Sequence, residues 1–75
     1  MIKFEKIQKK LSEAIKQSGK SQSEIARQIG VKPQQVSAYV LGKQMPAIDN
    51  LAKLCAVLDL DANDLLCIED YYKEN

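Results

Sequence analysis

The sequence contains no histidine and no tryptophan, and its 75 residues include only one phenylalanine, two cysteines, two prolines and three glycines. Without histidine, the two cysteines supply only half of the four ligands of a structural zinc site, so no metal site is expected. No apolar run approaches the roughly 20 residues of a membrane-spanning helix, and the lysine-rich start lacks the apolar stretch of a secretory signal. These absences favour a cytoplasmic protein without a membrane partner. In that compartment Cys55 and Cys67 are expected to be reduced thiols, with a disulfide between them as the alternative.

The same scarcity argues against catalysis. A histidine base is missing, neither cysteine has an identifiable base partner, and no glycine-rich phosphate-binding loop occurs. The acidic residues suit helix starts and solvent-facing positions better than a catalytic pair. We therefore expect no enzyme activity, no catalytic residues, no cofactor and no small-molecule ligand.

The net charge of +1 conceals an uneven distribution along the chain. Residues 1–43 carry nine basic and three acidic side chains, whereas residues 44–75 carry two basic and seven acidic ones, so the two parts have charges of +6 and −5. This asymmetry suggests a basic face for a polyanion and an acidic face turned away from it. An ordinary solvated surface is the alternative, and charge alone does not exclude it.

Apolar residues recur at spacings of three and four, which predicts an all-α protein, and a chain this short has material for one core. The expected fold is a compact five-helix domain with helices at about 3–18, 21–30, 33–42, 47–58 and 61–68. The apolar stripe of the first helix consists of Phe4, Ile7, Leu11, Ala14, Ile15 and Ser18, and that of the fourth of Ile48, Leu51, Leu54, Cys55 and Leu58. Residues 1–68 then form the domain, and residues 69–75 an acidic C-terminal tail or the start of a linker.

The helix ends carry their own signals. The segment Ser21-Gln22-Ser23-Glu24 fits a capping box, in which the Ser21 hydroxyl and the Glu24 carboxylate each accept a backbone amide of the other residue. Gly30 and Gly42 suit helix C-termini, and Pro33 suits the first position of a helix. Asp61 is the expected N-cap of the last helix.

The segment from Gln22 to Leu41 has the layout of a helix-turn-helix, with a short turn that contains glycine. Counted from Gln22 as position one, such motifs carry apolar residues at positions four, eight, ten, fifteen and eighteen, a small residue at five and glycine at nine. The sequence supplies Ile25, Ile29, Val31, Val36, Tyr39, Ala26 and Gly30 at these positions. The small residue lets the second helix cross closely, and the glycine allows a positive φ at the corner.

The stretch "SQSEIARQIGVKPQQVSAYVLGKQMPAIDNLAKLCAVLDLDANDLL" resembles the lambda-repressor-like, Cro-type helix-turn-helix family over nearly the whole domain. Two positions depart from the family pattern. Asp59 stands where glycine is frequent, and aspartate tolerates the left-handed conformation. Val40 stands where a charged residue is frequent, and it is either additional core or an exposed contact.

This resemblance implies a role for individual residues. The helix at about 33–41 would lie in the major groove, with Gln34, Gln35 and Ala38 contacting bases. The expected contacts to the DNA backbone are Gln22, Lys32, Ser37, Lys43 and Gln44. On this interpretation the fold itself requires neither glutamine.

The expected function is sequence-specific binding of double-stranded DNA by a helix-turn-helix transcriptional regulator, a repressor. Because so small a domain makes few contacts, we expect a homodimer on a two-fold related operator. The alternative is a protein-interaction adaptor or antitoxin-like module that uses the same fold. The basic half of the chain favours nucleic acid.

Overall fold

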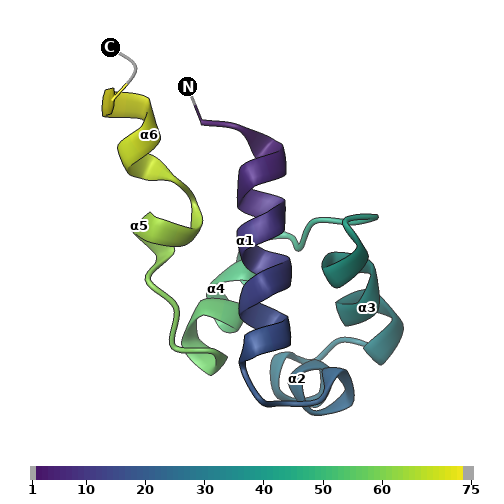
Figure 1. Ribbon diagram of the computed structural model, residues 1–75. Helices are drawn as coiled ribbons and strands as arrows, with labels where there is room; N and C mark the ends of the chain where they lie inside the picture. The colour runs from purple at the N-terminus through teal and green to yellow at the C-terminus, as the bar shows by residue number, and fades with distance from the viewer. Residues whose placement is uncertain (1, 74–75) are drawn as a thin grey trace.

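Six α-helices account for most of residues 2–73, which are the residues that the computed structural model describes (Figure 1). No strand occurs within this range. Helix α1 is central, α3 lies on one side of it, and α5 and α6 lie on the other. Helix α2 packs against both α3 and α4. The helices are α1 (Phe4–Gln17), α2 (Gln22–Ile29), α3 (Pro33–Leu41), α4 (Ile48–Val57), α5 (Ala62–Leu65) and α6 (Ile68–Lys73).

The first four helices begin and end close to the predicted residues. The Ser21 hydroxyl accepts the backbone amide of Glu24 at 3.0 Å. Among the described residues, this is the only one of the two hydrogen bonds of the predicted capping box. The bond from the Ser21 amide to the Glu24 carboxylate does not occur there. Gly30 ends α2 at φ +79°, in the left-handed region, and Pro33 is the first residue of α3.

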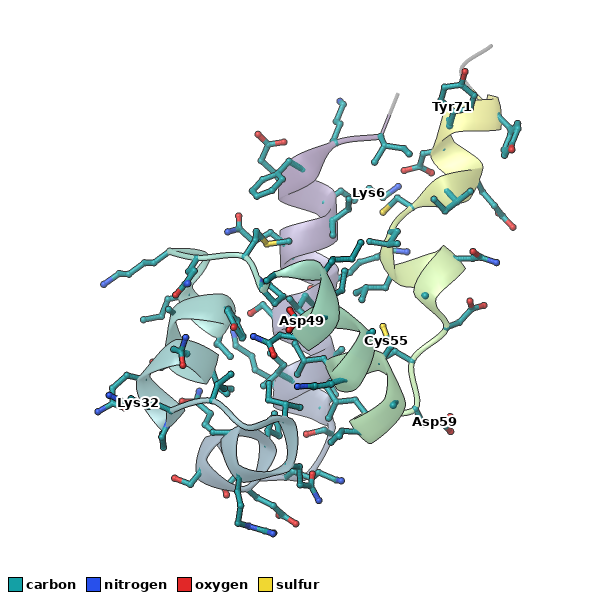
Figure 2. The ribbon with its side chains drawn as sticks, turned by 180° about the vertical axis from the view of Figure 1, so that it is seen from behind. Lys6, Lys32, Asp49, Cys55, Asp59 and Tyr71 are labelled. Atoms are coloured by element: carbon teal, nitrogen blue, oxygen red, sulfur yellow. The ribbon has the colours of Figure 1, made fainter. Side chains whose placement is uncertain are left out.

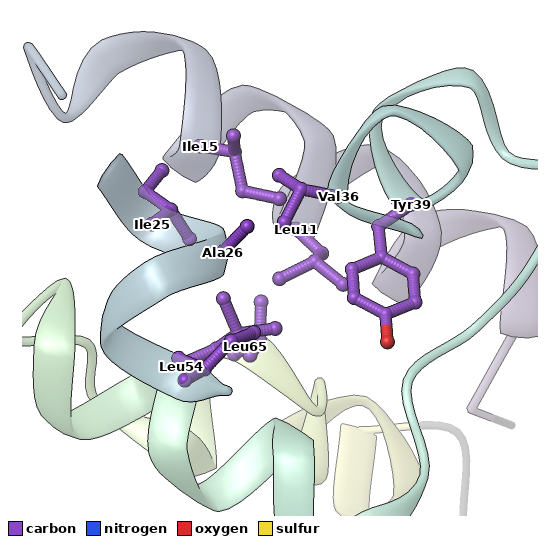
Figure 3. Packing of buried hydrophobic residues seen from close by; sticks show 9 residues of the cluster. Leu11, Ile15, Ile25, Ala26, Val36, Tyr39, Leu54 and Leu65 are labelled. Atoms are coloured by element: carbon purple, nitrogen blue, oxygen red, sulfur yellow. The ribbon is translucent and has the colours of Figure 1, made fainter. Parts of the chain in front are cut away.

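The core joins α1, α2, α3, α4 and α5 through one cluster of buried side chains (Figure 3). Ala26 is 1% exposed, as expected where α2 and α3 cross closely, and Tyr39, also 1% exposed, is a core residue. Val40 packs half-buried against the cluster, so it is additional core. The cluster consists of Leu11, Ile15, Ile25, Ala26, Ile29, Val36, Tyr39, Leu54 and Leu65.

Two residues assigned to apolar stripes lie on the surface instead. Phe4 is 57% exposed and Ile48 is 86% exposed. Each is the first residue of its helix, α1 and α4 respectively. Periodicity identifies the face on which a residue lies but not how far along that face the neighbouring helix extends, so the first turn can be left uncovered.

The predicted single helix over residues 61–68 is wrong, because the segment contains two elements. The Asp61 carboxylate does cap the first of them, accepting the amide of Asn63 at 3.0 Å. Helix α5 then ends at Leu65, and Cys67 adopts φ +57°, which breaks the helical path before α6. The predicted domain boundary after residue 68 falls at the start of α6 and stays a prediction. Residues 74 and 75 of the predicted tail lie outside the described range.

Two lysine–aspartate pairs hold α5 and α6 against α1. Lys6 Nζ lies 2.6 Å from Asp70 Oδ2, and Lys10 Nζ lies 3.0 Å from Asp64 Oδ1. Hydrogen bonds from the two ammonium groups to Asp70 and Asp64 raise the pKa of Lys6 and of Lys10 above the ordinary value of 10.5. Figure 2 shows Lys6 on the side of α1 that faces α6. Part of the positive charge of α1 is therefore neutralised on the side away from α3.

Both cysteines are free thiols, as expected from the sequence. Cys67 is buried and Cys55 is half-buried, and burial raises the pKa of the Cys55 thiol.

Asp59, the residue that stands where related sequences often have glycine, adopts φ +53° and so uses the left-handed conformation. Across residues 2–73, every helix is too short or too polar to cross a membrane.

Candidate nucleic-acid interface

Helices α2 and α3 meet at a tight corner. The backbone amides of Gly30 and Val31 both donate to the carbonyl of Ala26, at 2.9 and 3.0 Å. Val31 is half-buried and packs against the core cluster. Backbone hydrogen bonds and the packing of Val31 therefore both stabilise the turn. Together they fix the direction in which α3 leaves it.

Helix α3 has one buried face and one accessible face. Val36 and Tyr39 are 0% and 1% exposed and attach the helix to the core. Gln34 is exposed, Ala38 is half-exposed and Leu41 is 65% exposed. These three residues are spaced by four and three, so they lie along a single side of the helix. A rigidly held helix therefore presents Gln34 and Ala38 to the outside.

Gln35 has a structural role that the sequence interpretation missed. Its side-chain oxygen accepts the backbone amide of Lys32 at 3.0 Å. Lys32 is the N-cap of α3, and its own side chain carries no acceptor that could cap the helix, so Gln35 supplies the bond from the third helical position. The expectation that the fold requires neither glutamine is wrong for Gln35, and for the exposed Gln34 it stays a prediction.

The residues predicted to contact the DNA backbone lie at the start of α2, at the two ends of α3 and within α3. Gln22 is exposed at the first position of α2, and Lys32 is exposed at the start of α3 and points away from the core (Figure 2). Lys43 and Gln44 are exposed just beyond the end of α3, and Ser37 is half-buried along the helix. The structure brings all of the predicted site residues to one helix-turn-helix unit.

The turn and α3 carry no carboxylate, and the one acidic residue of the helix-turn-helix unit is Glu24 in α2. No acidic residue occurs between Glu24 and Asp49, a segment that includes the turn, all of α3 and the following loop. Lys32 and Lys43 flank α3 at its two ends. A polyanion that approached α3 would meet lysines and neutral side chains rather than carboxylates from the same segment.

Two residues of α1 also belong to the surroundings of α3. The Gln8 side-chain amide donates to the Gly42 carbonyl at 2.6 Å, and the Ser12 hydroxyl donates to the Val40 carbonyl at 2.8 Å. The sequence interpretation did not identify them, because helical periodicity shows only that they lie off the apolar stripe. The sequence shows only that each is a polar residue at the edge of a buried apolar stripe. It does not show which backbone carbonyl the side chain bonds.

Comparison with known proteins agrees with this geometry. A family model described as helix-turn-helix matches residues 11–65. A solution structure of the SOS-response transcriptional repressor LexA from Eubacterium rectale is similar at a TM-score of 0.73 and 29% sequence identity, covering 88% of this chain and 73% of the other. The comparison with curated proteins gives no match. The chain therefore belongs to the lambda-repressor/Cro-type helix-turn-helix family of DNA-binding transcriptional regulators.

Proposed function

We propose that the chain is a sequence-specific repressor that binds double-stranded DNA with α3 in the major groove. The observation that carries this proposal is the division of α3 into a buried face, with Val36 and Tyr39, and an accessible face, with Gln34 and Ala38. Glutamine can form two hydrogen bonds with the N6 and N7 atoms of adenine, and an alanine methyl can contact the methyl group of thymine. Gln34 and Ala38 therefore supply the two kinds of contact that read an A·T pair.

Gln35 would contact a base in a more limited way. Its side-chain oxygen already accepts the Lys32 amide, which leaves the side-chain nitrogen as the group free to turn toward DNA. That nitrogen can donate to a purine N7. We therefore propose one hydrogen bond to a base from Gln35, in contrast to the paired bonds of Gln34.

The remaining site residues would hold the phosphates. Gln22 lies at the N-terminus of α2, where exposed backbone amides and the helix dipole favour an anion. Lys32 and Lys43 would contribute positive charge at the two ends of α3, and Ser37 and Gln44 would donate hydrogen bonds. These contacts fix the register of the protein on the duplex but do not by themselves select a sequence.

Repression and dimerisation complete the proposal. Repression is favoured by the likeness to LexA, a transcriptional repressor, and needs only that the bound protein block an operator. A recognition helix of nine residues makes few base contacts, so useful specificity requires two copies on a two-fold related site.

A salt series with random duplex DNA tests the binding itself. Affinity should be measurable at low salt, and its logarithm should fall linearly with the logarithm of the salt concentration, because lysines displace counterions from phosphates. Undetectable binding at low salt, or binding that does not weaken with salt, would refute the DNA proposal. The adaptor or antitoxin-like alternative would then explain the fold.

Selection of bound duplexes from a random pool gives the preferred sequence, and two substitutions then separate base contacts from phosphate contacts. Gln34→Ala should weaken binding to the preferred sequence by about 1–3 kcal/mol and leave binding to random DNA nearly unchanged. Lys43→Ala should weaken binding to both duplexes alike, since a phosphate contact carries no sequence information. An equal loss on the two duplexes for Gln34→Ala would contradict direct readout by this residue.

A further inference from the structure

The C-terminal end of α3 has more backbone carbonyls than its own turn can satisfy. The amides of Lys43 and Gly42 donate back to the carbonyls of Ala38 and Tyr39, at 2.9 and 3.3 Å. This is the bonding pattern of a Schellman motif, with Gly42 in the left-handed conformation at φ +76°. The carbonyls of Val40 and Gly42 lie beyond the reach of this motif and need donors from elsewhere.

Helix α1 supplies those donors. Ser12 Oγ lies 2.8 Å from the Val40 carbonyl oxygen, and Gln8 Nε2 lies 2.6 Å from the Gly42 carbonyl oxygen. Gln8 and Ser12 are four residues apart, so they stand one turn above each other on α1. The fit at Gly42 is close, because a Cβ atom there would come within 2.9 Å of the Gln8 side-chain nitrogen.

We propose that Gln8 and Ser12 are positioning residues for DNA readout, which set the direction of α3 by fixing its C-terminal end to α1. This inference rests on the proposed function. Val36 and Tyr39 attach the inner face of α3 through apolar contacts, which have little directional preference. Near the end of the helix Val40 adds another apolar contact, half-buried against the core, whereas the last residue, Leu41, is 65% exposed. The two hydrogen bonds from α1 supply the missing directional restraint.

A small change of direction matters because Gln34 and Gln35, two of the residues proposed to contact bases, lie at the other end of the helix. A nine-residue helix is about 13 Å long, so a tilt of about 5° moves its far end by about 1 Å. A hydrogen bond tolerates a few tenths of an ångström before it weakens. Loss of the restraint from Gln8 and Ser12 should therefore disturb the contacts of Gln34 while the phosphate contacts, which are less demanding in geometry, persist.

The test measures the affinity of each variant for the preferred duplex and for a random duplex. Every substitution replaces one uncharged side chain with another, so the net charge of the protein does not change. Preferred-duplex affinity should fall about tenfold in the combined Gln8→Met and Ser12→Ala variant, and random-duplex affinity should stay within about twofold. Ser12→Thr keeps the hydroxyl and should retain the wild-type ratio of the two affinities. Gln17→Met, an exposed position near the end of α1, is the matched control and should also retain it.

The ratio of the two affinities separates positioning from stability. If the variants only unfolded more easily, binding to both duplexes would fall by the same factor and the ratio would not change. Residual dipolar couplings of the free protein should show a changed direction of α3 relative to α2 in the combined variant. An unchanged affinity ratio or an unchanged helix direction overturns the inference while the proposed function stands. A wild-type protein that does not distinguish the duplexes refutes sequence-specific readout and, with it, the role of Gln8 and Ser12.

Discussion

Gly30 and Gly42 end α2 and α3 in nearly the same backbone conformation but in different surroundings. Their φ values are +79° and +76°. Apart from its two neighbours in the chain, no atom of residues 2–73 lies within 4 Å of a Cβ built on Gly30, whereas a Cβ on Gly42 meets the Gln8 side chain. Gly30→Ala should lower the free energy of unfolding by about 1–2 kcal/mol, the cost of a left-handed residue with a side chain. Gly42→Ala should cost about 0.5–1.5 kcal/mol more, because the Gln8 hydrogen bond is lost as well.

The measurement is urea denaturation of both variants in the wild-type and Gln8→Ala backgrounds. Without the Gln8 side chain, the two glycine substitutions should cost the same. The difference between backgrounds then measures the coupling between Gln8 and Gly42. Equal costs for Gly30→Ala and Gly42→Ala in the wild-type background would contradict the close fit at Gly42.

Gln34 and Gln35 are adjacent residues with different expected roles. Substitution of each should therefore have a different effect on the free energy of unfolding. Gln34→Ala removes an exposed side chain and should change the free energy of unfolding by less than about 0.5 kcal/mol. Gln35→Ala removes the acceptor for the Lys32 amide and should cost about 0.5–1.5 kcal/mol. Gln35→Glu keeps an acceptor at the positive end of the helix and should be as stable as wild type.

DNA binding by the Gln35→Glu variant then isolates the base contact. The carboxylate preserves the cap but lacks the nitrogen that would donate to a purine N7, and its charge weakens binding to any duplex, so the ratio of the affinities for the preferred and the random duplex should fall. A Gln35→Glu protein with wild-type stability and wild-type sequence preference would show that Gln35 serves only the helix.

At the scale of elements, the attachment of α6 and α5 to α1 should depend on pH on the alkaline side. The pKa values of Lys6 and Lys10 are raised above 10.5 by Asp70 and Asp64, so the folded protein holds these protons more tightly than the unfolded chain. The stabilisation is then fully present below pH 10.5 and is lost as pH rises through the raised pKa values. Unfolding should be followed by circular dichroism from about pH 8 to about pH 12.

Substitution of the two lysines provides the comparison. The combined Lys6→Gln and Lys10→Gln variant should be less stable than wild type at neutral pH, and the difference should shrink as pH rises above 10.5. Lys9→Gln alters an exposed lysine of the same helix that forms no ion pair within residues 2–73, and it should show no such trend. A difference that persisted at high pH would assign the effect to packing of the lysine stems rather than to their charge.

The elements also show how far the sequence could predict the fold and the candidate site. The first four helices follow from local signals: apolar periodicity, the Ser21 cap, Gly30 and Pro33. The break between α5 and α6 does not, because it depends on Cys67 in a left-handed conformation and no glycine or proline marks it. Gln34 and Ala38 could be assigned to the accessible face because their positions follow from the motif.

The roles of Gln8, Ser12 and Gln35 could not be predicted in the same way. The first two act through hydrogen bonds between α1 and α3, and the spacing of residues along one helix does not specify the carbonyl groups of another. Gln35 occupies the third position of α3, where glutamine can complete a cap, but the usual small polar partner at the N-cap is replaced by Lys32.

Across the whole molecule, the charges are arranged so that one side suits a polyanion. Lys32 and Lys43 flank α3, whereas the carboxylates of Asp64 and Asp70 belong to the helices on the opposite side of α1 (Figure 1). DNA contacted by α3 would therefore face the lysines, and the acidic helices would be turned away. This separation limits repulsion between the bound protein and phosphates.

The two-fold arrangement proposed for binding makes a geometric prediction about the operator. Two copies related by a two-fold axis present their α3 helices to successive turns of the major groove, so the half-sites should be centred about 34 Å apart. Insertion of five base pairs between the half-sites moves them about 17 Å further apart and turns one to the opposite face of the duplex. A dimer of fixed geometry cannot then engage both, so affinity should fall to that of a single half-site. Sedimentation should give two protein chains per intact operator. If the affinity does not change when the five base pairs are inserted, each chain binds its half-site independently.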